Sequence, residues 1–322
     1  MIRAGWVARL LALISLSYAT GILAQLPAPP TSANPPESSP ESSVATLDDP
    51  TERLQVDVVV GDSAHYRFPV DTASTRSVIA DRPAQEMHLA RGAPVDVQNI
   101  GGTDRVASVL VPRIAFADLV IRDVHAPALS GTNLGSDGLI GLDMLKNQRL
   151  TVDFLDHAKM SLTASDRSGR MAAPIDGNTI IVKARSRFGE LILTDADIDG
   201  HKIAVVIDTG SQDSVGNAAL RALVEKRLRG TEIIPIKLIS VTGRKIDADW
   251  TTIGRVRVGG LALANLGIAF ADAATFRQFG LDKKPAILLG MGALRLFDSI
   301  SIDFPRREIR FVMAQRAATN IR

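Results

Sequence analysis

Two short segments of the chain place an acidic side chain beside hydroxyl groups in the same order. One is Asp71-Thr72-Ala73-Ser74 and the other is Asp208-Thr209-Gly210-Ser211, and each follows directly on an apolar run. A strand that enters such a loop delivers its carboxylate to a fixed place, and the neighbouring hydroxyl groups can donate hydrogen bonds that orient it. Two carboxylates a few ångströms apart tend to share one proton, which leaves one general base and one general acid in a single site.

One Asp-Thr-Gly segment alone is weak evidence, because the same tripeptide forms ordinary turns. The two segments, however, belong to a longer duplication in which Asp71 and Asp208 stand 137 residues apart. Further matches follow in the same order: Arg113–Phe116 with Arg255–Val258, Leu139-Ile140-Gly141 with Leu288-Leu289-Gly290, and Val152-Asp153-Phe154 with Ile302-Asp303-Phe304. The separation grows along the chain, as it does between two copies of one domain that differ by loop insertions.

Each copy has the residue pattern of a β-domain. Apolar runs of about five to eight residues alternate with polar residues and are separated by glycine or polar turns. Each copy also predicts one tight hairpin: Val95–Ile100 and Thr103–Val109 flank Gly101-Gly102, and Lys237–Val241 and Arg244–Trp250 flank Thr242-Gly243. Glycine suits the positive φ that such turns require. Short helices are expected over Ala218–Leu228, Ala273–Phe279 and Leu142–Gln148.

The N-terminal segment has the layout of a secretory signal peptide. Two arginines, Arg3 and Arg9, precede the short apolar run 10–16, and small residues follow at Ala19 and Ala24. An uncleaved membrane anchor is the alternative, although the run is short for a spanning helix. Residues 25–50 are rich in proline and serine and predict a disordered linker.

Composition excludes several classes of function. The formal net charge is +2, aromatic residues make up 4% of the chain and no basic run is interleaved with aromatics, so nucleic acid is not an expected partner. The chain has no cysteine, which removes disulfides and thiolate chemistry. None of the five histidines lies at metal-ligating spacing, and Ser211 is not in a G-x-S-x-G turn, so neither a metal nor a cofactor is expected.

The duplicated loops resemble those of the pepsin and retropepsin superfamily of aspartic peptidases. More narrowly, the sequence looks like the bacterial retropepsin-like proteins that carry two such domains on one chain. The resemblance covers roughly residues 52–315 and depends on Asp71-Thr72-Ala73-Ser74, Asp208-Thr209-Gly210-Ser211, Ile140-Gly141 and Leu289-Gly290. The hairpin at Asn99–Gly102 resembles a retropepsin flap, and Ser240–Gly243 would be the second flap.

This resemblance implies an all-β, two-lobed fold of closed barrels that are related by a pseudo-twofold axis and carry few short helices. We expect a signal peptide at 1–24, the linker at 25–50, one lobe at 51–165, an interlobe connection at 166–188 and the second lobe at 189–315. The implied catalytic pair is Asp71 and Asp208. The implied supporting residues are Thr72, Ser74, Thr209, Gly210 and Ser211 in the loops, with Ile100, Gly101, Gly102, Val241, Thr242 and Gly243 in the flaps.

The implied activity is that of an aspartic endopeptidase that hydrolyses peptide bonds with a water activated by the two carboxylates. The substrate would be an extended peptide or protein, and the enzyme would be exported to the periplasm or secreted, with a possible N-terminal membrane tether. Two lobes on one chain remove the need for the dimer that single-domain retropepsins form, so a monomer is expected. The sequence does not identify the substrate, the signal cleavage site or the pH optimum.

One departure from the family pattern keeps other functions open. Position 73 is alanine where the family has glycine, which adds a Cβ where two loops must pack closely. A catalytically weak or silent peptide-binding module on the same fold is therefore the alternative, and a purely structural envelope protein is the third hypothesis. The repeated Asp153 and Asp303 could also form a carboxylate pair, but each is expected to pin the end of a strand.

Overall fold

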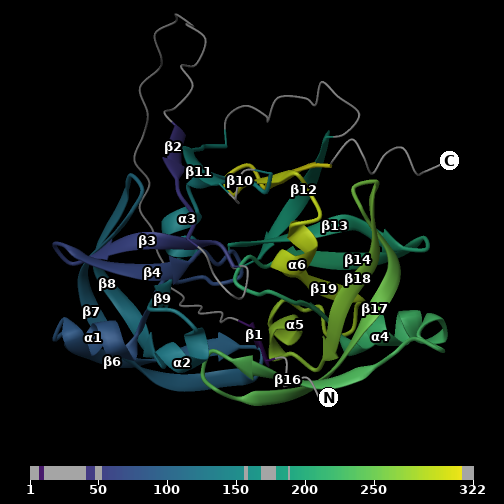
Figure 1. The fold of residues 1–322 in the computed structure, drawn as a ribbon, viewed down its shortest axis with the longest axis horizontal. Coiled ribbons are helices and arrows are strands. Elements are labelled where there is room, and N and C mark those ends of the chain that lie inside the picture. The colour runs from purple at the N-terminus through teal and green to yellow at the C-terminus, as the bar shows by residue number, and fades with distance from the viewer. Residues whose placement is uncertain are drawn as a thin grey trace, which may run out of the picture.

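The computed structural model describes residues 7–10, 41–47, 53–155, 159–167, 179–187 and 189–313. The chain forms two β-rich lobes that lie side by side, with a sheet across one end that draws strands from both (Figure 1). Most of the described residues lie in strands, and the helices are short. The all-β, two-lobed expectation is confirmed.

The N lobe is a seven-stranded sheet with three short helices. Its strands follow the order β4-β3-β7-β8-β5-β9, with β6 paired to β7. A bridge between Val70 and Ile140 closes the barrel where β4 meets β9. The elements are β3 (Gln55–Val60), β4 (Ala64–Pro69), β5 (Val78–Ala80), β6 (Ala90–Asn99), β7 (Gly102–Phe116), β8 (Leu119–Leu129), β9 (Gly138–Leu139), α1 (Asp81–Glu86), α2 (Gly131–Leu134) and α3 (Leu142–Leu145).

The C lobe repeats this plan. The pairing of β13 with β17 closes the strands into a ring in the order β13-β14-β19-β15-β18-β17, and β16 pairs with the outer part of β17. Its elements are β13 (Glu190–Ile198), β14 (His201–Ile207), β15 (Ser214–Gly216), β16 (Ile234–Ser240), β17 (Lys245–Val258), β18 (Leu261–Ala271), β19 (Ala286–Leu289), α4 (Ala218–Val224), a 3₁₀ turn (Glu225–Arg227), α5 (Ala274–Gln278) and α6 (Met291–Leu294).

The third sheet joins the lobes. Its strand order is β12-β21-β20-β10-β11-β2, with β10 (Gln148–Asp153) from the first copy paired antiparallel to β20 (Ser299–Asp303) from the second. The other members are β2 (Glu41–Val44), β11 (Lys159–Ala164), β12 (Thr179–Arg187) and β21 (Glu308–Val312). A strand near the N-terminus, β1 (Val7–Leu10), pairs in parallel with β16.

Two segments that the sequence predicted to be irregular are strands. The linker expected over 25–50 includes β2, which pairs with the open edge of β11. The connection expected over 166–188 includes β12, which pairs with β21 on one side and with β13 on the other. In both cases the backbone partner comes from a distant part of the chain. Apart from β1, the expected signal peptide (residues 1–6 and 11–24) lies outside the described residues, and the signal peptide stays a prediction.

One apolar cluster runs from the core of the N lobe through the interlobe sheet into the C lobe. It includes Phe68 and Phe116 in the N lobe, Leu150 and Ile302 on the central strands, and Ile287 in the C lobe, each at most 1% exposed. This continuity makes the two lobes one packed unit. No helix in the described part of the chain is long and apolar enough to cross a membrane.

Candidate active site

The two aspartates follow equivalent strands and are held in the same way. The backbone N–H of Asp71 donates to the carbonyl of Ile140 at 2.9 Å, and that of Asp208 donates to the carbonyl of Leu289 at 3.0 Å. The glycine after each acceptor is required by close packing: a Cβ on Gly141 would lie 2.3 Å from the backbone of Arg76. The repeated apolar-apolar-Gly elements therefore fix the strand that carries each aspartate.

A reciprocal set of hydrogen bonds joins the two loops. The backbone N–H of Thr72 donates to Oγ1 of Thr209 at 3.1 Å, and the N–H of Thr209 donates to Oγ1 of Thr72 at 3.2 Å. Each hydroxyl then donates across to the strand that leads into the other loop, Thr72 to the carbonyl of Ile207 at 2.8 Å and Thr209 to that of Val70 at 2.7 Å. Both threonines are buried, so this threonine pair fixes the two loops against each other.

The carboxylates are oriented by backbone N–H groups rather than by the hydroxyls that the sequence suggested. The N–H of Ala73 donates to Oδ1 of Asp71 at 2.8 Å, and the N–H of Gly210 donates to Oδ1 of Asp208 at 3.0 Å. The hydroxyls of Ser74 and Ser211 each donate to a backbone carbonyl two residues ahead. The two serines therefore shape the loops, and the expectation that hydroxyl groups orient the carboxylates was wrong.

The Asp71 carboxylate lies directly against the loop of the other lobe. A Cβ built on Gly210 would stand 2.4 Å from Cγ of Asp71, a distance that real contacts do not reach. Glycine is therefore required at position 210 for the carboxylate to occupy this place. Ala73 is the counterpart of Gly210 in the first loop, and its backbone N–H still donates to Asp71 as Gly210 does to Asp208.

Burial and mutual repulsion make it costly to ionise both aspartates. Asp71 is fully buried and Asp208 is 1% exposed. Burial, followed by the charge of Asp208, raises the pKa of Asp71 well above its usual value of 3.8. Burial raises the pKa of Asp208 to about 7, against the opposing effect of the N–H groups of Gly210 and Ser211. The pair therefore retains a proton in the range where ordinary carboxyl groups have lost theirs.

Two hairpin tips reach from one lobe to the other. The N flap is residues 99–102, between β6 and β7, and the C flap is residues 240–243, between β16 and β17. Ile100 is 1% exposed and packs in a C-lobe cluster with Val206 and Leu238 among others, and its carbonyl accepts from the N–H of Ala274 at 2.8 Å. Val241 is 2% exposed and packs against N-lobe residues, among them Val78, Leu129, Leu134 and Leu139. Each tip is thus inserted into the opposite lobe.

The flaps also bind one another. Arg244 donates through Nε to both oxygens of Asp104, at 2.8 and 3.0 Å, which joins β7 to the hairpin of the C lobe. Oγ1 of Thr242 donates to Oδ2 of Asp104 at 2.6 Å, and Nδ2 of Asn99 donates to that same hydroxyl at 3.2 Å. Gly101 packs against Arg244, and Gly102 and Gly243 take the positive φ values of 126° and 85° that the turns require. The two flaps are therefore closed against each other.

Sequence reasoning missed two buried charged residues near the pair. Arg53 is 2% exposed and its charge lowers the pKa of Asp71. Glu190 is fully buried, and the charges of Asp71 and Asp208 add to burial in raising its pKa well above its usual value. Arg53 and Glu190 stand 137 residues apart, like the two aspartates. They directly precede Leu54 and Leu191, so aligning the two copies from one residue earlier would have paired them.

The other acidic candidates have structural roles. Asp303 has a fully buried side chain that accepts from Nε of Arg149 at 3.0 Å and from the hydroxyl of Ser165 at 2.9 Å. Asp153 accepts from the N–H of Leu155 at 2.9 Å. Both therefore pin the ends of their strands. In the described ranges, no group of three or more acidic or histidine side chains is arranged to hold a metal ion.

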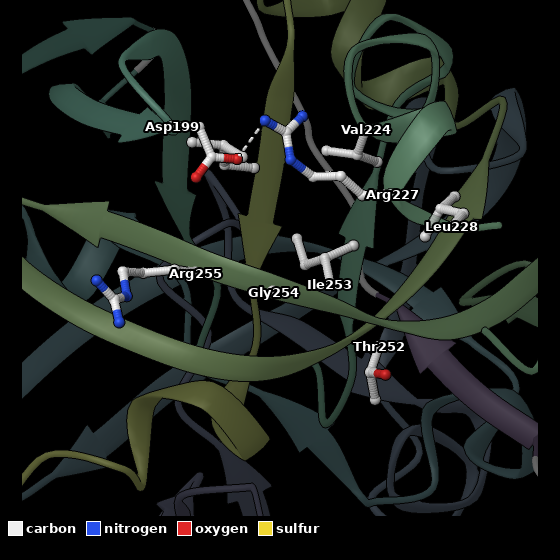
Figure 2. A pocket seen from close by; sticks show the side chains of 9 residues that line it. Asp199, Val224, Arg227, Leu228, Thr252, Ile253, Gly254 and Arg255 are labelled. Atoms are coloured by element: carbon white, nitrogen blue, oxygen red, sulfur yellow. Dashed lines mark ion pairs between the residues drawn. The ribbon is translucent and has the colours of Figure 1, made fainter. Parts of the chain in front are cut away.

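A small cavity in the C lobe is separate from this site. It measures about 180 Å³, and its wall includes Val224, Leu228 and Ile253 (Figure 2). At its rim, Arg227 forms an ion pair with Asp199 at 2.6 Å. Its lining includes neither aspartate of the pair and no residue of either flap, so it does not extend the candidate site.

Comparison with protein families assigns each lobe separately. Residues 56–147 match the family model described as gag-polyprotein putative aspartyl protease, and residues 194–293 match the one described as aspartyl protease. Each matched range includes one loop of the aspartate pair and one flap. No curated protein matches the chain.

Proposed function

Because this chain belongs to the retropepsin-like aspartic proteases and carries two such domains in tandem, we propose that it is an aspartic-type endopeptidase with Asp71 and Asp208 as its catalytic pair. One observation carries the proposal. Two buried carboxyl groups are delivered by equivalent loops that Thr72 and Thr209 fix against each other, and the Asp71 carboxylate lies against Gly210 in the other loop. A stably folded scaffold gains nothing from two adjacent buried carboxyl groups with raised pKa values, whereas a hydrolase uses them.

The chemistry follows from one shared proton. The ionised carboxylate removes a proton from a water molecule held between the pair as that water attacks the carbonyl carbon of the peptide. The protonated carboxyl donates its proton to the carbonyl oxygen and gives a neutral tetrahedral diol. When the C–N bond breaks, the protonated carboxyl donates its proton to the leaving nitrogen while the ionised carboxylate takes a proton from a diol hydroxyl, so a carboxylic acid and an amine form and the pair stays singly protonated. Because the two groups titrate together, neither role is assigned to one aspartate.

Substrate binding requires the flaps to open. The pair is at most 1% exposed in the closed structure, and both flap tips are inserted into the opposite lobe. An extended peptide would take the place of the flap tips against the opposite lobes. Its backbone would then pair with the backbone of the hairpins as an added strand. Closure over the peptide would then exclude bulk water from the reacting carbonyl.

A catalytically weak or silent peptide-binding module is the second candidate, and Ala73 favours it. At the equivalent position 210, a methyl group would collide with Asp71. In the first loop the methyl group is present, and Ala73 is 3% exposed. If that methyl group displaces Asp208 from the water site, the chain would hold extended peptides without cleaving them.

The decisive experiment compares wild type with Asp208→Asn on a denatured protein substrate, with circular dichroism as the control for folding. Cleavage by wild type and its loss in the folded variant support the endopeptidase. A pepstatin-type inhibitor distinguishes the alternatives, since tight binding without any turnover by wild type supports the silent module. Wild type that neither cleaves nor binds the inhibitor would contradict both.

We further propose that the protein is exported and acts as a monomer in the periplasm or outside the cell. The charged start, apolar run and small residues of the N-terminal segment support export. The two lobes on one chain support the monomer, because together they supply both aspartates. Cell fractionation and N-terminal sequencing of the mature protein would test export and distinguish a cleaved signal from an N-terminal membrane tether.

A further inference from the structure

A third buried carboxyl group lies close enough to the aspartate pair for their charges to act on it, and it has no role in the proposed chemistry. Glu190 is the first residue of β13 and is fully buried. Neither of its carboxylate oxygens has a hydrogen-bond partner among the described residues. Leaving two buried oxygens without partners costs free energy, so a residue with a purely structural role would not be expected to do so.

The counterpart of Glu190 in the first copy has a structural role. Arg53 and Glu190 each stand 18 residues before the aspartate of their own copy. The guanidinium of Arg53 donates to the carbonyls of Leu134 and Gly135, at 2.9 and 3.2 Å, where α2 ends. These bonds satisfy carbonyl groups that a helix end leaves without partners.

In the second copy a different arginine fills that role. The loop after α5 resembles the loop after α2, since Gly280 and Gly135 have positive φ values of 65° and 67°. There the carbonyl of Phe279 accepts a hydrogen bond from Nη1 of Arg187, at the end of β12. Glu190 is therefore not needed to bind carbonyl groups as Arg53 does, and its side chain is acidic where that of Arg53 is basic.

The two sides of the site consequently differ in charge. The charge of Arg53 acts on Asp71, whereas Glu190 adds a third carboxyl group to the field of Asp71 and Asp208. A substrate side chain that reaches Glu190 once the flaps open would meet two carboxyl oxygens that lack donors among the described residues. A lysine or arginine side chain supplies both the positive charge and the donors, and charge-assisted hydrogen bonds of this kind are the strong ones.

We propose that Glu190 is a specificity-determining residue, which selects substrates with a lysine or arginine side chain at the position that lies against the start of β13. The inference deepens the proposed function and rests on it. Binding of the basic side chain satisfies the Glu190 carboxylate, so Glu190 distinguishes substrates without touching the scissile bond.

The test is a cleavage-site profile on a mixture of synthetic peptides that presents all residue types at four positions on either side of the cut. Wild type should favour lysine or arginine at one position. For a matched pair of peptides with lysine or norleucine there, Glu190→Gln should lower kcat/KM for the lysine peptide roughly 10- to 100-fold and change that for the norleucine peptide less than about twofold. Asp195→Asn removes an exposed carboxylate from the same strand and should leave both values unchanged.

Three outcomes would overturn the inference. The first is a profile without a basic preference, and the second is an equal loss for both peptides in Glu190→Gln. The third is a shift of the pH–rate profile that is the same for both peptides, which would mean that Glu190 acts on the titration of the aspartate pair.

A binding measurement separates this inference from the proposed function. The same two peptides are titrated into Asp208→Asn and into the double variant Asp208→Asn/Glu190→Gln by calorimetry. Preference for the lysine peptide that disappears in the double variant would support the role of Glu190 even if wild type cleaved nothing. Equal binding of both peptides to both variants would refute it.

Discussion

Thr151 and Ser301 face each other on the two central strands of the interlobe sheet, and their hydroxyl oxygens lie 2.7 Å apart. Each is the counterpart of the other in the duplication, as are Thr72 and Thr209. Two residues related by a twofold axis can face each other only on that axis. The pseudo-twofold axis therefore passes between Thr151 and Ser301 and between Thr72 and Thr209, and the aspartate pair belongs to the loops that meet on it.

Loss of the threonine pair should destabilise the protein and separate the loops. Thr72→Val keeps the side-chain shape but leaves the N–H of Thr209 and the carbonyl of Ile207 without their buried partner. We expect a loss of about 1–3 kcal/mol in the free energy of unfolding, measured with urea. Thr72→Ser keeps the hydroxyl and should lose less. In a double-mutant cycle, Thr72→Val and Thr209→Val should be less than additive, and full additivity would contradict the shared network.

Neutralising one buried aspartate should stabilise the protein at neutral pH. Because the folded-state pKa of Asp208 is raised to about 7, its contribution to stability is lost as the pH rises from about 4 through 7. Asp208→Asn should therefore increase the free energy of unfolding by on the order of 2–4 kcal/mol at pH 8 and change it little at pH 4. Thermal unfolding at both pH values measures the difference. Destabilisation at pH 8 would show that the carboxylate is better solvated than its burial indicates.

Activity should fall as the aspartate pair loses its last proton. The proposed chemistry needs one proton on the pair. The pKa of Asp208 is raised to about 7 and that of Asp71 well above its usual value, so the pair gives up its last proton no lower than about pH 7. We expect kcat/KM for a peptide to decline about tenfold per pH unit above that point. A substrate without titratable side chains, tested with the stability of the enzyme checked at each pH, isolates this effect. A rate that rises steadily into the alkaline range would exclude the pair as the catalytic groups.

Several elements could be predicted from the sequence because their signal is local. Alternating apolar residues and turn glycines, such as Gly102 and Gly243, predicted two β-rich copies and both hairpins. The resemblance to the retropepsins implied the two-lobed barrels, and the fold expectation is confirmed. The strands β2 and β12 were missed because their hydrogen-bonding partners come from distant segments. Glu190 was missed because a buried carboxyl group without a partner is a property of the packing and has no motif of its own.

Opening of the flaps should depend on the ion pair between Arg244 and Asp104. Replacing Arg244 by Gln removes the bonds from its guanidinium to Asp104 and leaves only those through Thr242, so it should increase amide hydrogen exchange in residues 99–104 and 240–245. The hydrogen bonds from Arg244 lower the pKa of Asp104 to about 2, so the ion pair is lost only as the pH falls through that value. The difference should therefore persist at pH 4.

A matched control is available on the same hairpin. Lys237 and Asp247 form an ion pair within the C-lobe hairpin that does not reach the N flap. Lys237→Gln should leave exchange in residues 99–104 unchanged. Equal exchange in wild type and Arg244→Gln would mean that the inserted tips and the hydrogen bonds of Thr242 keep the flaps closed without Arg244.

The two small residues of the aspartate loops should respond in opposite ways to substitution. Gly210→Ala places a methyl group where Cγ of Asp71 is 2.4 Å away, so the carboxylate or the loop must move. We expect kcat to fall at least about 100-fold, because a displacement of about 1 Å can cost that much.

Ala73→Gly removes the methyl group that distinguishes the first loop from the second and should keep or raise kcat. Its stability should fall by up to about 1 kcal/mol, because glycine adds freedom to the unfolded chain. If instead Gly210→Ala retains full activity while both aspartates remain essential, the pair tolerates a methyl group on either side, and Ala73 no longer favours a silent module.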